Sequence, residues 1–126
     1  MGKKKDVSVI KMIVEEMVVI GSRVVCDRNQ IVYEKGAAAE YLYILEQGYI
    51  EFIDKEVLRF SVNHFGDVFG WASLSETEIY MNTAISRTIS SVIQIPKDAA
   101  NDILFKHKVN VMEFSNNLEP VFENGW

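Results

Sequence analysis

The segment that decides the fold is His64-Phe65-Gly66-Asp67-Val68-Phe69-Gly70-Trp71-Ala72-Ser73-Leu74. Its two glycines flank an acidic residue, a valine and a phenylalanine, and glycine adopts a positive φ without a Cβ penalty. The segment therefore predicts a sharp turn after a strand, followed by a helical turn that begins near Trp71. Backbone amides at such a turn would face an anion. A tight loop between two strands explains the same residues.

Short runs rich in β-branched and aromatic residues surround this segment. They predict strands at 23–26, 31–34, 41–46, 49–54, 57–62, 80–86 and 88–95, with a brief helical turn at 37–40. Between 57 and 62 the residues alternate, so we expect Leu58, Phe60 and Val62 to face the core. Many short strands at regular spacing predict a mainly β, antiparallel sandwich or barrel.

Helical spacing of apolar residues appears near both ends of the chain. Residues 7–19 predict one helix, and Pro96 suits the first turn of a second helix that ends near His107. A third helix is predicted from about Val109, and Pro120 should end or bend it. Its apolar stripe consists of Val111, Phe114, Leu118 and Val121.

Length and charge restrict the possible functions. The chain has 126 residues, enough for one domain, and a net charge of −5. Its only basic cluster is 3–5, so we expect no direct nucleic-acid binding. The apolar run 7–20 is interrupted by charges and lacks a signal-peptide cleavage site, which predicts no membrane span and a cytoplasmic location. The single Cys26 allows no internal disulfide.

The chain carries no recognisable catalytic or metal-binding motif. It has only two histidines, far apart, and lacks a His-x-His pair, a Gly-x-Ser-x-Gly motif, a Walker loop and a zinc motif. We therefore predict no catalytic residues, no metal site and no cofactor.

Three segments taken together resemble a known family. Residues 36–53, 66–70 and 92–97 are similar to the cyclic nucleotide-binding domain of the catabolite activator and Fnr-type regulators, and the resemblance runs from about Arg23 to Leu118. It implies an antiparallel jelly-roll with flanking N- and C-terminal helices. The expected division is an N-terminal tail and helix at 1–22, the jelly-roll at 23–96 and C-terminal helices at 97–126.

The resemblance also implies where a ligand would bind. In the family, a glutamate directly after the second glycine contacts the ribose, backbone amides contact the cyclic phosphate, and a later arginine pairs with it. Here Trp71 stands in the glutamate's place, residues 79–84 contain no arginine, and Arg87 lies downstream, where a strand should carry it away. The sequence thus argues against ordinary cyclic AMP or GMP binding. The ligand-binding residues expected here are Phe69, Gly70, Trp71, Ala72, Ser73, Leu74, Tyr80, Asn82 and Thr83.

Three interpretations of this pocket remain open. In the first, the pocket binds a different small-molecule effector. In the second, it binds haem, with His64, His107, Cys26 or a methionine as the iron ligand. In the third, the pocket is vestigial and the domain is a dimerisation or docking module. In the family the last helix commonly pairs with its counterpart in a second subunit. Val111, Phe114, Leu118 and Val121 would form that homodimer seam, unless the stripe packs on the domain's own barrel. Because the chain stops at Trp126 without a helix-turn-helix, we expect it to act through a partner protein or to be a fragment.

Overall fold

The computed structural model describes residues 7–121, with the backbone alone of Val7 and of residues 119–121. The described helices are α1 (Val7–Ile20), α2 (Lys97–Lys106) and α3 (Val111–Val121), with a 3₁₀ helix, η1 (Trp71–Leu74). The described strands are β1 (Ser22–Cys26), β2 (Gln30–Tyr33), β3 (Tyr41–Gln47), β4 (Ile50–Asp54), β5 (Val57–Val62), β6 (Val68–Phe69), β7 (Thr83–Ser86) and β8 (Ser90–Pro96).

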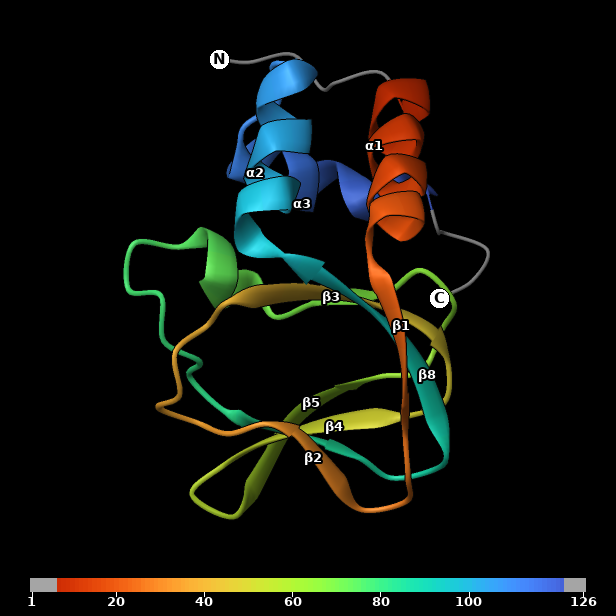
Figure 1. The fold of residues 1–126 in the computed structure, drawn as a ribbon. Coiled ribbons are helices and arrows are strands. Elements are labelled where there is room, and N and C mark those ends of the chain that lie inside the picture. Colours follow the sequence, from red (N-terminus) through yellow and green to blue (C-terminus); the bar gives the residue numbers. More distant parts are fainter. Residues whose placement is uncertain (1–6, 122–126) are drawn as a thin grey trace.

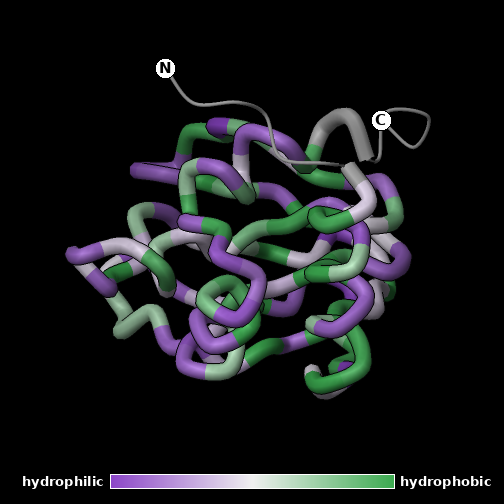
Figure 2. Tube along the Cα trace, turned by 90° about the horizontal axis from the view of Figure 1, so that it is seen from above, coloured by the Kyte–Doolittle hydropathy of each residue, from purple (hydrophilic) through white to green (hydrophobic). Residues whose placement is uncertain are grey.

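These strands form two four-stranded antiparallel sheets that face each other. The strand order is β1-β8-β3-β6 in the first sheet and β2-β7-β4-β5 in the second. The three α-helices lie together on the outer side of the first sheet (Figure 1). Hydrophobic and hydrophilic residues alternate along the chain when the molecule is seen from above (Figure 2), as expected where each element has one buried face. The predicted mainly β jelly-roll with helices at both ends is confirmed.

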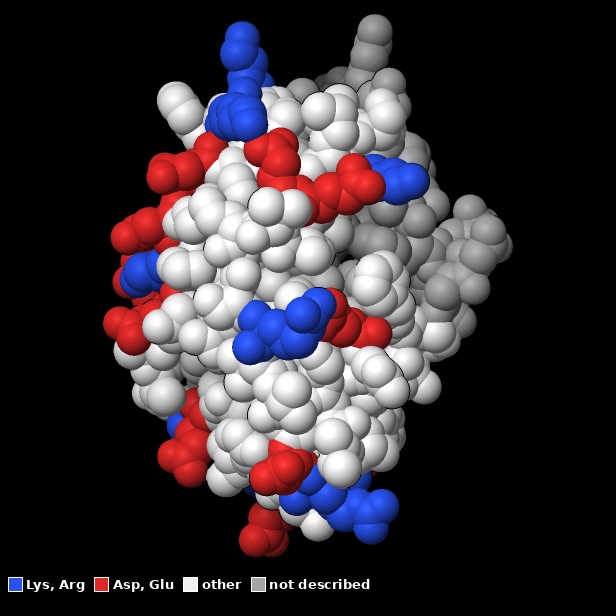
Figure 3. Space-filling view, turned by 45° about the vertical axis from the view of Figure 1, so that its right-hand side comes forward, with Lys and Arg blue, Asp and Glu red and all other residues white. Residues whose placement is uncertain are grey.

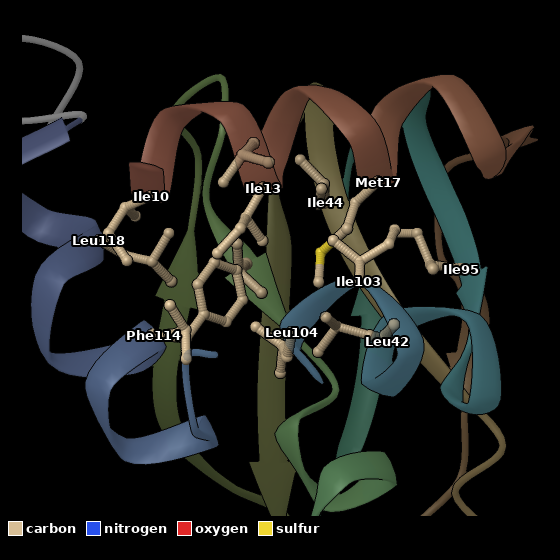
Figure 4. Close-up of a cluster of buried hydrophobic side chains, with 14 of the residues drawn as sticks. Ile10, Ile13, Met17, Leu42, Ile44, Ile95, Ile103, Leu104, Phe114 and Leu118 are labelled. Carbon is tan, nitrogen blue, oxygen red and sulfur yellow. The ribbon is translucent and has the colours of Figure 1, made fainter. Parts of the chain in front are cut away.

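Two hydrophobic cores separate the three layers. The outer core lies between the helices and the first sheet, and Figure 4 shows α1 directing Ile10, Ile13 and Met17 toward side chains of α2, α3 and the sheet. The inner core lies between the sheets and is rich in aromatic rings. Its buried members are Cys26, Tyr33, Ala39, Tyr43, Leu45, Ile50, Phe52, Val62, Phe69, Tyr80, Ala84 and Val92.

The burial predicted for β5 is wrong at two of its three positions. Val62 is buried, but Leu58 and Phe60 are 52% and 51% exposed. β5 lies at the edge of the second sheet, so the inner core covers its last residue and leaves the rest of the strand open. Alternation of apolar and polar residues indicates the two faces of a strand, but it does not indicate whether a second layer covers one of them.

The predicted helical turn at 37–40 and the predicted strand start at 80 are also wrong. Ala38 instead forms an isolated antiparallel bridge with Ile79. The Gly36 amide donates to the Tyr80 carbonyl at 2.8 Å, and the Tyr80 amide donates to the Ala37 carbonyl at 3.1 Å. These bonds hold Tyr80 against the 36–39 segment, and β7 begins only at Thr83.

Local caps explain where the C-terminal helices begin. Pro96 stands at the N-cap of α2, one position before the first turn. Asn110 Oδ1 accepts from the Glu113 amide at 2.8 Å, while Glu113 Oε1 accepts from the Asn110 amide at 3.1 Å, a reciprocal capping box that starts α3 at Val111. The helix continues one residue past Pro120. Within residues 7–121, no helix combines the length and apolarity needed to cross a bilayer.

Candidate functional site

The glycine loop lies against β3 of the first sheet, because the Gly66 amide donates to the Leu45 carbonyl and the Leu45 amide donates to the Asp67 carbonyl, both at 2.8 Å. Gly66 and Gly70 have φ angles of 92° and 81° and are both buried, so the left-handed conformations predicted for them are confirmed. Asp67 fastens the loop, because its Oδ2 accepts from the amides of Asn63 at 3.2 Å and His64 at 2.9 Å. Burial raises the pKa of the Asp67 carboxyl, and these two hydrogen bonds oppose that shift.

Gly70 is the position at which the chain leaves β6 for η1. A Cβ there would stand 3.0 Å from both the Tyr41 carbonyl oxygen and Tyr43 Cδ2. The Ser73 hydroxyl and amide both donate to the Gly70 carbonyl, at 2.8 and 3.1 Å. Glycine is therefore needed here for space as well as for φ.

A cavity of about 480 Å³ opens beside this turn. Its walls come from η1, from the loop before β7 and from the second sheet. Its volume falls in the range of small-molecule pockets. The residues lining it are Tyr33, Phe52, Phe60, Val68, Phe69, Gly70, Trp71, Ala72, Ser75, Thr77, Tyr80, Met81 and Asn82.

Aromatic rings dominate the walls. Tyr33 stacks on Tyr80 with ring centroids 3.7 Å apart and planes inclined by 9°. Phe52 stacks on Phe60 at 4.3 Å, and Phe69 contacts the Tyr33 ring at 6.3 Å. Burial raises the pKa of the Tyr33 and Tyr80 phenols, so both stay neutral at physiological pH.

Most polar side chains at the cavity already have partners within the protein. The Tyr80 hydroxyl donates to the Tyr41 carbonyl at 2.7 Å. The Ser75 hydroxyl donates to the Ala72 carbonyl at 2.8 Å and lies 2.9 Å from Thr77 Oγ1. None of the described lining residues carries a charge at neutral pH.

Trp71 joins the cavity to the helical layer. Its indole Nε1 donates to the Val68 carbonyl at 3.2 Å, and its ring meets the buried Phe114 ring of α3 with centroids 5.6 Å apart. The side chain is half-buried, packs against the outer core and also lines the cavity. A displacement of this indole would therefore alter the packing beneath α3.

Six of the nine residues expected to bind a ligand line the cavity: Phe69, Gly70, Trp71, Ala72, Tyr80 and Asn82. The other three do not. Ser73 is buried with its hydroxyl on Gly70, Leu74 packs against the outer core, and Thr83 Oγ1 accepts from the Lys35 amide at 3.1 Å. The prediction omitted Tyr33, Phe52, Phe60, Val68, Ser75, Thr77 and Met81. The aromatic residues of the predicted strands were the available signal, but sequence spacing alone did not show that they converge.

Arg87 lies away from the cavity, as expected. Its Nε pairs with Glu51 Oε1 at 2.8 Å, and its guanidinium also donates to Asn29 Oδ1 at 3.1 Å. On the face shown in Figure 3, lysines and arginines lie beside acidic side chains instead of forming a continuous basic patch.

The haem ligands considered from the sequence lie at three separate places. His64 stands beside Asp67, His107 pairs with Glu16 at the end of α2, and Cys26 is buried in β1, where burial raises the pKa of its thiol. Among residues 7–121, no three His, Cys, Asp or Glu side chains gather as a metal site would require.

The stripe predicted as a dimer seam faces the chain's own core. Phe114 is fully buried and Leu118 is 6% exposed, and both belong to the outer core. Val111 is partly buried against the same core, and the side chain of Val121 lies outside the described residues. This packing corresponds to the alternative interpretation of the stripe, and dimerisation stays a prediction.

Comparison with known proteins agrees with this architecture. The family described as "Cyclic nucleotide-binding domain" matches residues 23–107, and the chain therefore belongs to that family. Domains of this family are regulatory and ligand-sensing, and they are typically not enzymes. No curated protein matches the chain by sequence.

Solved structures share the fold at low sequence identity. A putative cyclic nucleotide-binding protein from Geobacter metallireducens has a TM-score of 0.69 and 17% identity, over 88% of this chain and 83% of that one. The sensor domain of the transcriptional regulator DNR from Pseudomonas aeruginosa has a TM-score of 0.69 and 18% identity, over 90% and 79%. The Thermus thermophilus catabolite activator protein has a TM-score of 0.69 and 14% identity, and the match covers 90% of this chain and 53% of that one.

Proposed function

We propose that this domain senses a small-molecule effector in the aromatic cavity and that its pocket is non-standard for the family. The observation that carries the proposal is the uncharged wall of the cavity. Trp71 occupies the position after the second glycine, where the family places an acceptor for the ribose, and an indole N–H cannot accept a hydrogen bond.

The missing cation sets the expected affinity for cyclic nucleotides. A guanidinium paired with a phosphate in a dry pocket forms charge-assisted bonds, and its loss costs about 2 to 5 kcal/mol. This corresponds to an affinity about 30-fold to several thousand-fold weaker. Arg87 does not compensate, because Glu51 and Asn29 hold its guanidinium elsewhere.

The contact between Trp71 and Phe114 supports a route from the cavity to the helices. An effector that contacts the indole would change how α3 packs on the outer core. A partner protein that recognises the helical layer would then respond to the effector. This part of the proposal agrees with the regulatory character of the family.

The proposal is tested by thermal-shift screening of the wild-type chain against cyclic AMP, cyclic GMP and a panel of uncharged and acidic metabolites. Each hit is repeated with Phe60→Ala, which removes a cavity wall, and with Leu58→Ala as a matched control. Leu58 lies on the same strand and is equally exposed, but it does not line the cavity. We expect at least one hit that Phe60→Ala weakens and Leu58→Ala preserves.

Two results would contradict the proposal. Micromolar binding of cyclic AMP by the wild-type chain would show that the cavity binds a cyclic phosphate without a guanidinium. A flat response to the whole panel would favour the vestigial pocket in a docking module.

A further inference from the structure

We infer that the effector is a planar aromatic compound without an anionic group, and that it carries one amide-like edge, with a hydrogen-bond donor beside an acceptor. This inference rests on the proposed function and specifies the ligand class for the same cavity. Three properties of the walls carry it: their lack of charge, their flat rings and one uncommitted carboxamide.

The first property argues against an anionic occupant. A carboxylate or phosphate that enters the cavity loses its hydration, and none of the described lining side chains is a cation that could replace it. Two basic side chains in or beside the second sheet, Lys35 after β2 and Arg59 of β5, are already paired. Lys35 and Arg59 both meet Asp54, the latter at 3.8 Å.

The second property favours a flat occupant. Phe60 and Met81 line the cavity and are 51% and 65% exposed, so they offer apolar surface that is not covered by other protein atoms. Trp71 adds a half-buried indole to the same cavity. Stacking on such rings, and contact with the methionine sulfur, favour planar π systems over aliphatic chains.

The third property gives the polar edge of the occupant. Among the lining residues that the structure describes, Asn82 is the polar side chain without a hydrogen bond inside the protein. Tyr80, Ser75 and Thr77 have partners, the Trp71 indole donates to the Val68 carbonyl, and the Tyr33 phenol bonds to the Gly70 backbone. A carboxamide offers a donor and an acceptor side by side, so its natural complement is another donor–acceptor edge of the amide type. An occupant that lacked this edge would leave the Asn82 amide unpaired once water is displaced.

Three probes of nearly equal shape separate these properties. 2-Naphthamide is uncharged and carries the full edge, 2-naphthoate is its anionic counterpart, and 2-acetylnaphthalene is uncharged and has only the acceptor. Calorimetric titration measures each probe against the wild-type chain, Asn82→Leu, Asn82→Arg, Phe60→Ala and the control Leu58→Ala. The Asn82 variants should fold, because this side chain makes no hydrogen bond within the described protein.

We expect wild-type protein to bind 2-naphthamide at least about tenfold more tightly than 2-naphthoate, because only the anion must be desolvated without a counter-charge. Asn82→Leu should remove the preference for the amide over the ketone. Asn82→Arg should reverse the preference between amide and carboxylate, since it introduces a guanidinium into the cavity. Phe60→Ala should weaken all three probes, and Leu58→Ala none.

Equal or tighter binding of 2-naphthoate by the wild-type chain would overturn the inference, as would an amide preference that survives Asn82→Leu or the failure of all three probes to bind. These failures differ from failure of the proposed function. A carboxylate, or another compound from the screen, that binds and is weakened by Phe60→Ala leaves the sensor cavity intact and rejects only the ligand class. Binding that neither Phe60→Ala nor Asn82→Leu changes would place the ligand outside the cavity, and would reject both the ligand class and the proposed function.

Discussion

Replacing Tyr80 by phenylalanine tests how the first sheet ends beside the cavity. β6 has only two residues, Val68 and Phe69, which pair with Ile44 and Tyr43 of β3. The backbone of Tyr41 lies beyond this short partner strand. The Tyr80 hydroxyl takes the place of the missing neighbour, because it donates to the Tyr41 carbonyl at 2.7 Å and accepts from the Tyr41 amide at 3.4 Å.

The expected loss of stability follows from these two bonds. Removing one partner of a buried hydrogen bond costs about 1 to 3 kcal/mol, because the remaining group keeps its desolvation penalty. The 2.7 Å bond should contribute most of this, and the 3.4 Å bond little. We therefore expect Tyr80→Phe to lower the free energy of unfolding by about 2 kcal/mol, and Tm by roughly 6 to 10 °C for a domain of this size.

Calorimetry and urea unfolding of Tyr80→Phe measure this loss, with Tyr49→Phe as the matched control. The Tyr49 hydroxyl donates to the Glu51 carboxylate at 3.1 Å, at a partly exposed site, so its removal should cost about 0.5 kcal/mol or less. Equal losses in the two variants would refute the role assigned to Tyr80. Because the ring stacked on Tyr33 is retained, probe binding should change less than about threefold, under 1 kcal/mol.

Three further predictions follow from single contacts. Gly70→Ala should destabilise the fold more than Gly36→Ala does, by about 1 kcal/mol or more, because both have positive φ but only Gly70 has backbone within 3.0 Å of the added Cβ; urea unfolding compares them. Arg23, together with the Ser91 hydroxyl, lowers the pKa of Glu46 to about 2, so these contacts stabilise the fold above pH 4.5 and lose this effect as the pH falls toward 2. Since Arg23 is 63% exposed, Glu46→Gln should cost about 1 kcal/mol at pH 7 and progressively less below pH 4.5, as Tm measured against pH will show. Phe114→Ala should cost about 3 to 5 kcal/mol, and Phe114→Glu should unfold the chain instead of only separating subunits; circular dichroism with size-exclusion chromatography distinguishes these outcomes.

The sequence predicted seven of the eight described strands, because local signals fix them, and missed β6, whose two residues lie in the segment predicted as a turn. Most predicted strand ends lie within one or two residues of those observed. They are fixed by turns, such as those at Gly48 and Gly70, and by the β-branched runs between the turns. The exceptions depend on tertiary contacts. Tyr80 has strand propensity, yet its backbone pairs with the 36–39 segment, and this partner is far away in the chain.

Only part of the site was predicted, because only some of its residues are marked by a local sequence pattern. Gly70, Trp71 and Ala72 are contiguous and follow the glycine turn, so a local pattern identifies them. Phe52 and Phe60 line the same cavity because β4 and β5 pair with those two residues opposite each other, and that register is a property of the hairpin. Neither residue has a local signal that separates a cavity wall from a core position.

The cavity residues differ in how closely they are tied to the fold. Gly70 leaves no room for a Cβ beside β3, and Tyr80 bonds to the backbone of β3, so replacement of either residue should cost stability whatever ligand is present. Phe60, Met81 and Asn82 line the cavity without such a role, since two are half or more exposed and the third makes no hydrogen bond within the described chain. Changes at these three positions should therefore alter what the cavity binds while the jelly-roll stays intact. A new specificity in this fold is accordingly expected to arise first at β5 and at the loop before β7, and not at the glycine turn itself.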